Sequence, residues 1–126
     1  MHWFSIGVAL LVAFGIIVLG LMYLSNPRAA TQSFGLPLPE DGANVAWWLR
    51  LKGVRDVASG LVLLAVMTWG SFQMLGIVLM IEALVPVGDM SLILAARGST
   101  KTALSVHGLT AALMILAALP LMTGLA

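Results

Sequence analysis

The chain has 126 residues, of which 61% are hydrophobic and only 9% are charged, and its formal net charge is +1. Soluble domains carry roughly 25% charged residues, so this composition excludes an ordinary soluble domain, a disordered chain and a nucleic-acid binder with a basic surface. The length allows a single domain over residues 1–126, and the absence of cysteine excludes disulfides and cysteine-containing metal sites. The composition therefore predicts an integral membrane protein.

Four stretches are apolar enough, and long enough, to cross about 30 Å of hydrocarbon as helices. They cover residues 4–24, 46–69, 72–96 and 102–122. The breaks between them are Asn26-Pro27, Gly70-Ser71 and Arg97-Gly98-Ser99-Thr100. The first stretch follows no basic segment and has too long an apolar core for a cleaved signal peptide, so we expect a retained helix. The sequence thus predicts an all-α fold, a polytopic membrane bundle of four helices.

The basic residues predict the orientation of this bundle. All of them lie in or beside the two connections that share one side: Arg28, Arg50, Lys52, Arg55, Arg97 and Lys101. The side with both termini and the Gly70-Ser71 turn has none. Because cytoplasmic loops are enriched in Lys and Arg, we expect a multi-pass protein of the cell membrane with both termini facing away from the cytoplasm. The long connection 26–44 is interpreted either as a plain linker or as a lid over a site.

Ionisable side chains gather at one depth in three of the predicted helices. Counting residues from the outer boundary, at about 1.5 Å each, puts Arg55, Asp56, Asp89 and His107 about 20–24 Å inside, and Glu82 nearer the midplane. A charge at such depth costs about 2.5–3.5 kcal/mol or more, so charged side chains usually face the bundle interior in pairs. We therefore expect these five residues to meet inside the bundle.

Local spacing agrees with an inward-facing polar layer. Lys52 and Asp56 have opposite charges and are four residues apart, so they share a helix face. Glu82, Pro86 and Asp89 form one stripe of the third helix. Pro86 removes a backbone donor and opens a place for polar groups or water.

Small residues predict where the helices pack closely. They form one face of the second predicted helix, with Gly53 and Gly60, and one face of the fourth, with Ser105, Gly108 and Ala112. Both faces favour close approach of neighbouring helices.

The five ionisable residues are candidate catalytic groups. Nothing basic in the sequence is level with Glu82, so its carboxyl group is expected to favour the neutral form. We assign Glu82 or Asp89 as the general acid, His107 as a proton shuttle, and Arg55 as the cation that keeps Asp56 ionised. Arg55, Asp56, Asp89 and His107 also have structural interpretations, as ion pairs that hold helices in register or as a packed histidine; for Asp89 the partner would be Arg55 or Arg97.

Three motifs resemble a known family: Gly53-Val-Arg-Asp-Val-Ala-Ser-Gly60, Glu82-Ala-Leu-Val-Pro-Val-Gly-Asp89 and His107-Gly-Leu-Thr-Ala-Ala112. They are similar to small four-helix membrane proteins, broadly DoxX-like, that are catalogued as a domain of unknown function in bacteria and fungi. The resemblance extends over nearly the whole chain and implies a four-helix membrane fold, but it implies no reaction. A looser analogy, from architecture alone, is to membrane sterol isomerases and fungal terpene cyclases, which use buried carboxylates on lipophilic substrates.

Three hypotheses follow for function. The leading one is a membrane isomerase or cyclase that uses acid–base catalysis on a lipophilic small molecule, terpenoid or sterol-like. Since the sequence has no compact metal-ligand motif and no phosphate-binding glycine pattern, we expect neither a metal nor a cofactor. The second is a proton-coupled small-molecule transporter that works as a dimer, although its first helix lacks the carboxylate that small multidrug exporters carry there.

The third hypothesis is a non-catalytic membrane partner subunit whose charges serve assembly. The expected partners are the lipid bilayer and the lipophilic molecule, and no nucleic acid. Four short helices enclose only a small cavity, so a homo-oligomer is also considered.

Overall fold

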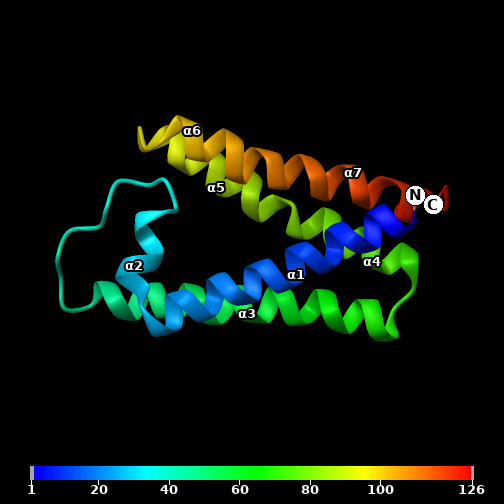
Figure 1. Ribbon diagram of the computed structural model, residues 1–126, viewed down its shortest axis with the longest axis horizontal. Coiled ribbons are helices and arrows are strands. Elements are labelled where there is room, and N and C mark those ends of the chain that lie inside the picture. Colours follow the sequence, from blue (N-terminus) through cyan, green and yellow to red (C-terminus); the bar gives the residue numbers. More distant parts are fainter. Residues whose placement is uncertain (1, 126) are drawn as a thin grey trace.

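A computed structural model describes residues 2–125 of the protein, and no strand occurs within this range. The elements in chain order are α1 (His2–Ser25), α2 (Pro27–Gln32), α3 (Val45–Trp69), α4 (Phe72–Glu82), α5 (Leu84–Ala95), α6 (Thr100–Thr102), the π-helical segment η1 (Ala103–Gly108) and α7 (Leu109–Thr123). Figure 1 shows that α5 continues the course of α4, and that α6, η1 and α7 form one continuous run. The predicted all-α class is confirmed for the described residues.

Three helical runs are long and apolar enough to cross a membrane. They are His2–Ser25, Phe72–Ala95 and Thr100–Thr123. Helix α3 has a similar length, but Lys52, Arg55 and Asp56 in its first half make it more polar. The chain therefore has the features of a membrane protein.

The connections lie at two opposite ends of the molecule. Both termini and the turn between α3 and α4 lie at one end, which we call the terminal end (Figure 1). Helix α2, the rest of the 26–44 connection and the turn between α5 and α6 lie at the other, which we call the loop end. This up-and-down course is the one that the predicted breaks require.

Helix α2 was not predicted, because Pro27 was interpreted only as the end of the first helix. Proline is favoured in the first turn of a helix, where the missing amide hydrogen has no partner to lose. Here Pro27 begins α2, and the Asn26 side chain accepts a hydrogen bond from the Ala29 amide at 3.3 Å. The same residue therefore ends α1 and starts the next helix.

Two close helix pairs, α1 with α3 and α4 with α7, build the molecule. Gly20 and Gly53 let α1 and α3 approach, since a Cβ added at Gly20 would lie 2.7 Å from the Gly53 carbonyl oxygen. Gly76 does the same for α4, where a Cβ would lie 2.9 Å from the Ala118 carbonyl oxygen of α7. The predicted small-residue face of the second helix is thus confirmed at Gly53 and at Gly60, where a Cβ would lie 2.6 Å from the Ala13 carbonyl oxygen of α1.

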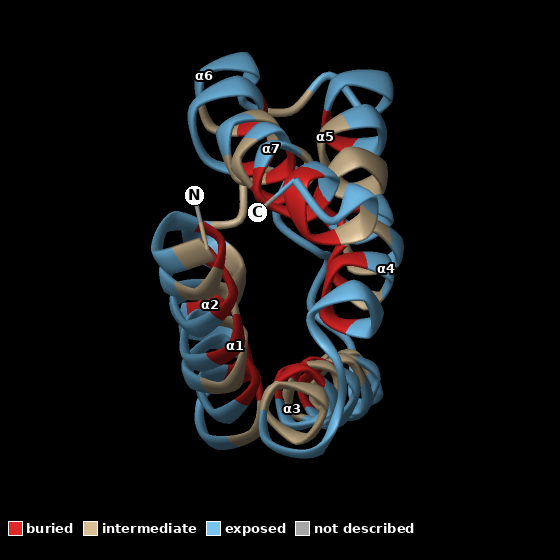
Figure 2. Ribbon diagram, turned by 90° about the vertical axis from the view of Figure 1, so that its right-hand side faces the viewer, coloured by how far each residue is buried: buried red, intermediate tan, exposed pale blue. Residues whose placement is uncertain are grey.

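The core lies near the terminal end, where the two pairs meet. Its buried members include Val8, Ala9, Ala13, Leu63, Leu75, Leu79, Met114, Ala117, Ala118 and Leu121. Figure 2 shows buried residues on the inward sides of α1, α4 and α7. The predicted small-residue face of the fourth helix is wrong in part, because Ser105 and Ala112 are exposed and alanines on another face make the contact.

Replacing Gly53 with alanine is expected to lower the free energy of unfolding by about 1–3 kcal/mol, because the added methyl group would push two backbones apart. A Cβ at this position would lie 2.7 Å from the Gly20 carbonyl oxygen and 3.0 Å from the Tyr23 Cβ. Gly7→Ala is the matched control, since a Cβ there meets no neighbouring atom within 4 Å. Chemical unfolding in detergent measures both variants, and equal effects would contradict the close contact between α1 and α3.

Candidate functional site

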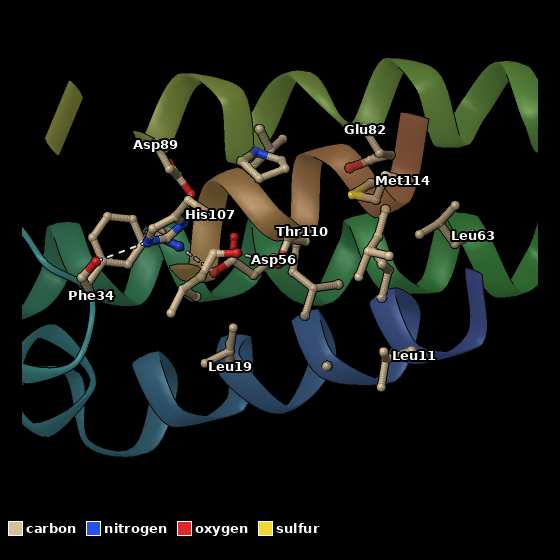
Figure 3. A pocket seen from close by; sticks show the side chains of 18 of the residues that line it. Leu11, Leu19, Phe34, Asp56, Leu63, Glu82, Asp89, His107, Thr110 and Met114 are labelled. Atoms are coloured by element: carbon tan, nitrogen blue, oxygen red, sulfur yellow. Dashed lines mark hydrogen bonds and ion pairs between the residues drawn. The ribbon is translucent and has the colours of Figure 1, made fainter. Parts of the chain in front are cut away.

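A cavity of about 520 Å³ runs along the inside of α1, between α3, α5 and the η1–α7 run (Figure 3). Toward the terminal end its lining is apolar, with Val8, Leu11, Val12, Leu63, Leu113 and Met114. Toward the loop end its lining is polar, with Tyr23, Lys52, Asp56, Asp89 and His107. Ligand pockets for small organic molecules commonly have about 300–1,000 Å³, so the cavity has the size and the two-part lining of such a pocket.

The polar part contains a carboxyl–imidazole pair formed by Asp89 of α5 and His107 of η1. The distance from Asp89 Oδ2 to His107 Nδ1 is 3.6 Å, which is within ion-pair range but longer than a hydrogen bond. The other ring nitrogen, Nε2, lies 3.0 Å from the Phe34 carbonyl oxygen. A carbonyl oxygen only accepts hydrogen bonds, so Nε2 must carry a hydrogen. Nδ1 is then either an acceptor facing Asp89 or the second N–H of an imidazolium.

Two irregularities in the helices position these groups. His107 lies within the π-helical segment η1, and such wide turns occur often at functional sites. Glu82 is the last residue of α4, directly before the break at Ala83. Pro86 has no amide hydrogen for the carbonyl four residues earlier, which belongs to Glu82. The irregular helix geometry that the sequence indicated at Pro86 is therefore present, whereas nothing in the sequence indicated η1.

Lys52 and Asp56 of α3 form a second charged pair in the cavity. Lys52 Nζ lies 2.6 Å from Asp56 Oδ2, as their spacing of four residues predicts. The ammonium group also lies over two aromatic rings, 4.5 Å from the centre of the Tyr23 ring and 5.2 Å from that of Phe34.

Arg55 is not the cation beside Asp56 that its position in the sequence predicts. Its side chain is exposed on α3 and is not among the cavity-lining residues, although Asp56 next to it is buried. Neighbouring residues on a helix point about 100° apart, so two residues at one depth can face opposite environments. The cation beside Asp56 is Lys52, and the partner of Asp89 is His107 rather than Arg55 or Arg97.

Glu82 lines the same cavity but lies farther from the loop end. It precedes Asp89 by seven residues, or about 10 Å of helix rise. Figure 3 shows Thr110 between the His107 position and the Glu82 position along the cavity. Glu82 is thus too distant to exchange a proton directly with His107, and Asp89 is the acid that the geometry brings to the imidazole.

Phe34 covers the polar part from the 26–44 connection. Its ring stands edge-on to the His107 ring with 4.8 Å between the centres. The backbone next to Phe34 is held in place, because the Ser99 amide donates a 2.8 Å hydrogen bond to the Gly35 carbonyl oxygen. Of the two interpretations of this connection, the structure favours the lid. The role of Phe34 was missed because only the apolar character of its segment was visible in the sequence.

Replacing Phe34 with alanine is expected to open the polar part to water from the loop end. Lys52, whose side chain is 34% exposed, should then react several-fold faster with a water-soluble amine reagent. Mass spectrometry of the modified peptide measures the rate in the intact protein. Leu38→Ala is the control, since Leu38 is exposed in the same connection and does not line the cavity; equal rates in both variants would contradict the lid.

The cavity does not present an evident metal site. Among residues 2–125, no group of three or more His, Asp, Glu or Cys side chains is arranged to hold a metal ion. What the described side chains offer is a set of acid–base groups, a paired lysine and an apolar wall.

Comparison with known proteins assigns a family. Neither the curated proteins nor the solved structures include a match to the chain. The family described as "Domain of unknown function (DUF4267)" matches residues 13–121, a range that includes Asp56, Glu82, Asp89 and His107. Since this match extends over most of the sequence and over both charged pairs of the cavity, the chain belongs to the DUF4267 family.

Proposed function

We propose that the protein is a cofactor-free membrane isomerase or cyclase, which moves a proton on an uncharged lipophilic molecule of the terpenoid or sterol-like kind. The observation that carries this proposal is the Asp89–His107 pair at the polar end of a long apolar cavity. An apolar wall binds a lipophile, and an acid beside an imidazole supplies the two partners of a proton transfer.

Besides the hydrogen on His107 Nε2, the reaction needs one transferable proton on the Asp89–His107 pair at the start and at the end of each turnover. In the isomerase form, the basic member of the pair takes a proton from a C–H bond next to a double bond. The electrons of the broken C–H bond form a new double bond to the adjacent carbon. The original double bond opens, and the acidic member of the pair gives a proton to the carbon at its far end. One C–H bond breaks and another forms, so charge and protons balance. The fixed hydrogen bond from Nε2 to the Phe34 carbonyl keeps Nδ1 as the nitrogen that exchanges protons.

The charges around the cavity favour an uncharged substrate. Among the described lining residues, Lys52 is the one lysine or arginine, and it is already paired with Asp56. A carboxylate or phosphate head group would therefore find no free cation and would face three carboxyl groups. A cationic head group would meet the Lys52 ammonium group, which already occupies the faces of both nearby rings.

The membrane arrangement belongs to the same proposal. Helix α3 matches α1 in length and packs closely along it, which supports four spanning helices rather than three. The basic residues of α3 and of the connections lie toward the loop end, and this favours a cytoplasmic loop end with both termini on the opposite side. The polar part of the cavity would then lie in the cytoplasmic half of the bilayer. A relationship with DoxX-like proteins, favoured by the three motifs, is also proposed.

Solvent deuterium tests this function without knowledge of the product. The purified protein in lipid nanodiscs is incubated in D₂O with a panel of isoprenoid and sterol-like ketones, alcohols and alkenes, and with carboxylates and amines of equal chain length. We expect deuterium in an uncharged member of the panel. A protein that incorporates deuterium into no member, yet conducts protons across liposomes in a Glu82-dependent manner, would contradict the enzyme and support the transporter.

A further inference from the structure

Some cavity-lining residues are also exposed at the surface, and they mark where the cavity opens. They are Leu11, Gly15, Leu19, Ser33, Val85 and Val106. Four of the six lie on α1 and η1, and the exposed fractions of Leu11, Leu19 and Val106 are 69%, 48% and 51%. Figure 3 shows Leu11 and Leu19 on α1, across the cavity from Met114 and His107. The cavity therefore opens chiefly along the seam between α1 and the η1–α7 run.

The packing of α1 explains why this seam is open. Helix α1 is held against α3 by the contact of Gly20 with Gly53, and against α7 by core residues such as Ala9 near the terminal end. Farther along α1, Gly15 contributes no side chain, and a Cβ added there would meet no neighbouring atom within 4 Å. A gap thus remains in the middle of the seam.

The depth of this gap along α1 indicates that it faces the acyl chains of the bilayer. Gly15 lies 13 residues after His2, or about 20 Å along a helix that is long and apolar enough to span a membrane. The residues that bound the gap on both sides are leucine and valine, which prefer contact with acyl chains. A dissolved ion or sugar would gain nothing there, whereas a molecule already dissolved in the membrane would meet only apolar groups.

We propose that an uncharged lipophile reaches the cavity sideways from the bilayer, through a portal bounded by Leu11, Gly15, Leu19 and Val106. Gly15 is the residue that keeps the portal open. This inference takes the chemical class of its ligand from the proposed function, but it concerns the route and not the reaction. With this route the membrane itself contributes to substrate selection, because only molecules that partition into the acyl-chain region reach the portal.

Gly15→Trp closes the portal without touching the acid–base groups, and Gly7→Trp is the matched control on the same helix. Gly7 is also open to its surroundings, but it does not line the cavity. The probe is an uncharged long-chain alcohol with a photoreactive diazirine in its tail, supplied from lipid nanodiscs that contain the full chain. Light pulses at increasing times, followed by mass spectrometry of cavity peptides, give the rates of binding and release.

A blocked portal slows binding and release by the same factor, whereas a filled cavity lowers the affinity. For Gly15→Trp we expect both rates to fall by about tenfold or more, with a dissociation constant within about threefold of the original. Gly7→Trp should leave both rates unchanged. Unchanged rates in Gly15→Trp, or slower exchange in Val85→Trp instead, would overturn the route through this seam.

A second variant tests the portal independently, in case Gly15→Trp folds poorly. The chain has no cysteine, so Leu19→Cys with Val106→Cys creates the only two thiols. Bridging them with a cleavable bifunctional reagent should slow labelling, and cleavage of the bridge should restore it; labelling that is indifferent to the bridge contradicts the portal. If the unaltered protein shows no labelling of the cavity at all, the proposed ligand class fails, and this outcome is distinct from a failure of the route.

Discussion

Asp89→Asn is expected to lower the rate of solvent deuterium incorporation by about 10²–10⁴-fold, the usual contribution of a positioned acid–base group. Asparagine keeps the shape of the side chain but cannot give or take a proton, so it removes the acid of the proposed transfer, whose carboxyl oxygen lies 3.6 Å from His107 Nδ1. The measurement compares initial rates of deuterium incorporation in nanodiscs with the binding of the same lipophile. Binding should change little, because the apolar wall is untouched.

The controls separate chemistry from folding. Asp41→Asn makes the same chemical change at an exposed residue of the 26–44 connection, which pairs with Arg28 outside the cavity, and it should leave the rate unaltered. His107→Gln retains an N–H that can donate to the Phe34 carbonyl oxygen, but it has no second ring nitrogen to exchange a proton. It should lose activity as Asp89→Asn does. Rates that stay within about threefold of the original in both cavity variants would rule out the acid–base role of this pair.

Lys52→Met should lower the free energy of unfolding by about 2–3 kcal/mol, because it leaves the Asp56 carboxylate without its cation. The side chain of Asp56 is only 12% exposed, and its Oδ2 lies 2.6 Å from Lys52 Nζ. The expected cost is below that of a fully buried pair, since the side chain of Lys52 is itself 34% exposed. Chemical unfolding in detergent, followed by circular dichroism, measures the effect.

Arg55→Met is the matched control for this prediction. Arg55 has the same charge and lies beside Asp56 in the sequence, but it is exposed and outside the cavity, so we expect a change within about 0.5 kcal/mol. Removing the carboxylate as well, in Lys52→Met with Asp56→Asn, should recover most of the lost stability. Equal losses in Lys52→Met and Arg55→Met, or no recovery in the double variant, would show that Lys52 does not neutralise Asp56.

The long helices could be predicted because the bilayer requires them. A chain in lipid must satisfy its backbone hydrogen bonds within each span, so runs of apolar residues between Pro, Gly and Ser breaks leave little choice. The predicted ranges 4–24 and 46–69 accordingly agree with α1 and α3 within two residues at each end. The break at Ala83, helix α2 and the π-helical segment η1 depend on how particular turns pack, and hydropathy carries no information on them.

The sequence could predict the depth of the candidate site residues along their helices, but not the direction in which each side chain points. Residue counts along three helices placed Asp56, Asp89 and His107 at one level, and the structure brings them to one cavity. The same counts placed Arg55 beside them, and here the turn of the helix carries the side chain to the outer face. The face of α3 was nevertheless marked in the sequence, because Lys52 lies four residues before Asp56 and therefore shares its side.

Tyr23 and Phe34 could not have been found in this way. Tyr23 lies at the end of an apolar helix where an interfacial position is the ordinary expectation, and Phe34 lies in a connection of irregular structure. Their place around Lys52 results from the packing of α1 against α3 and from the fold of the loop end. Long-range contacts of this kind leave no local pattern in a single sequence.

An experimental structure in lipid, with a brominated long-chain ketone or alcohol bound, tests the central claim most directly. We expect the tail of the ligand between Leu11, Leu63 and Met114, and its oxygen within hydrogen-bond distance of Asp89 or His107 at the polar end. Asp89 and His107 should remain within ion-pair distance of each other. A structure in which the two side chains point away from each other into lipid, or in which apolar side chains fill the space between α1 and α7, would contradict the account.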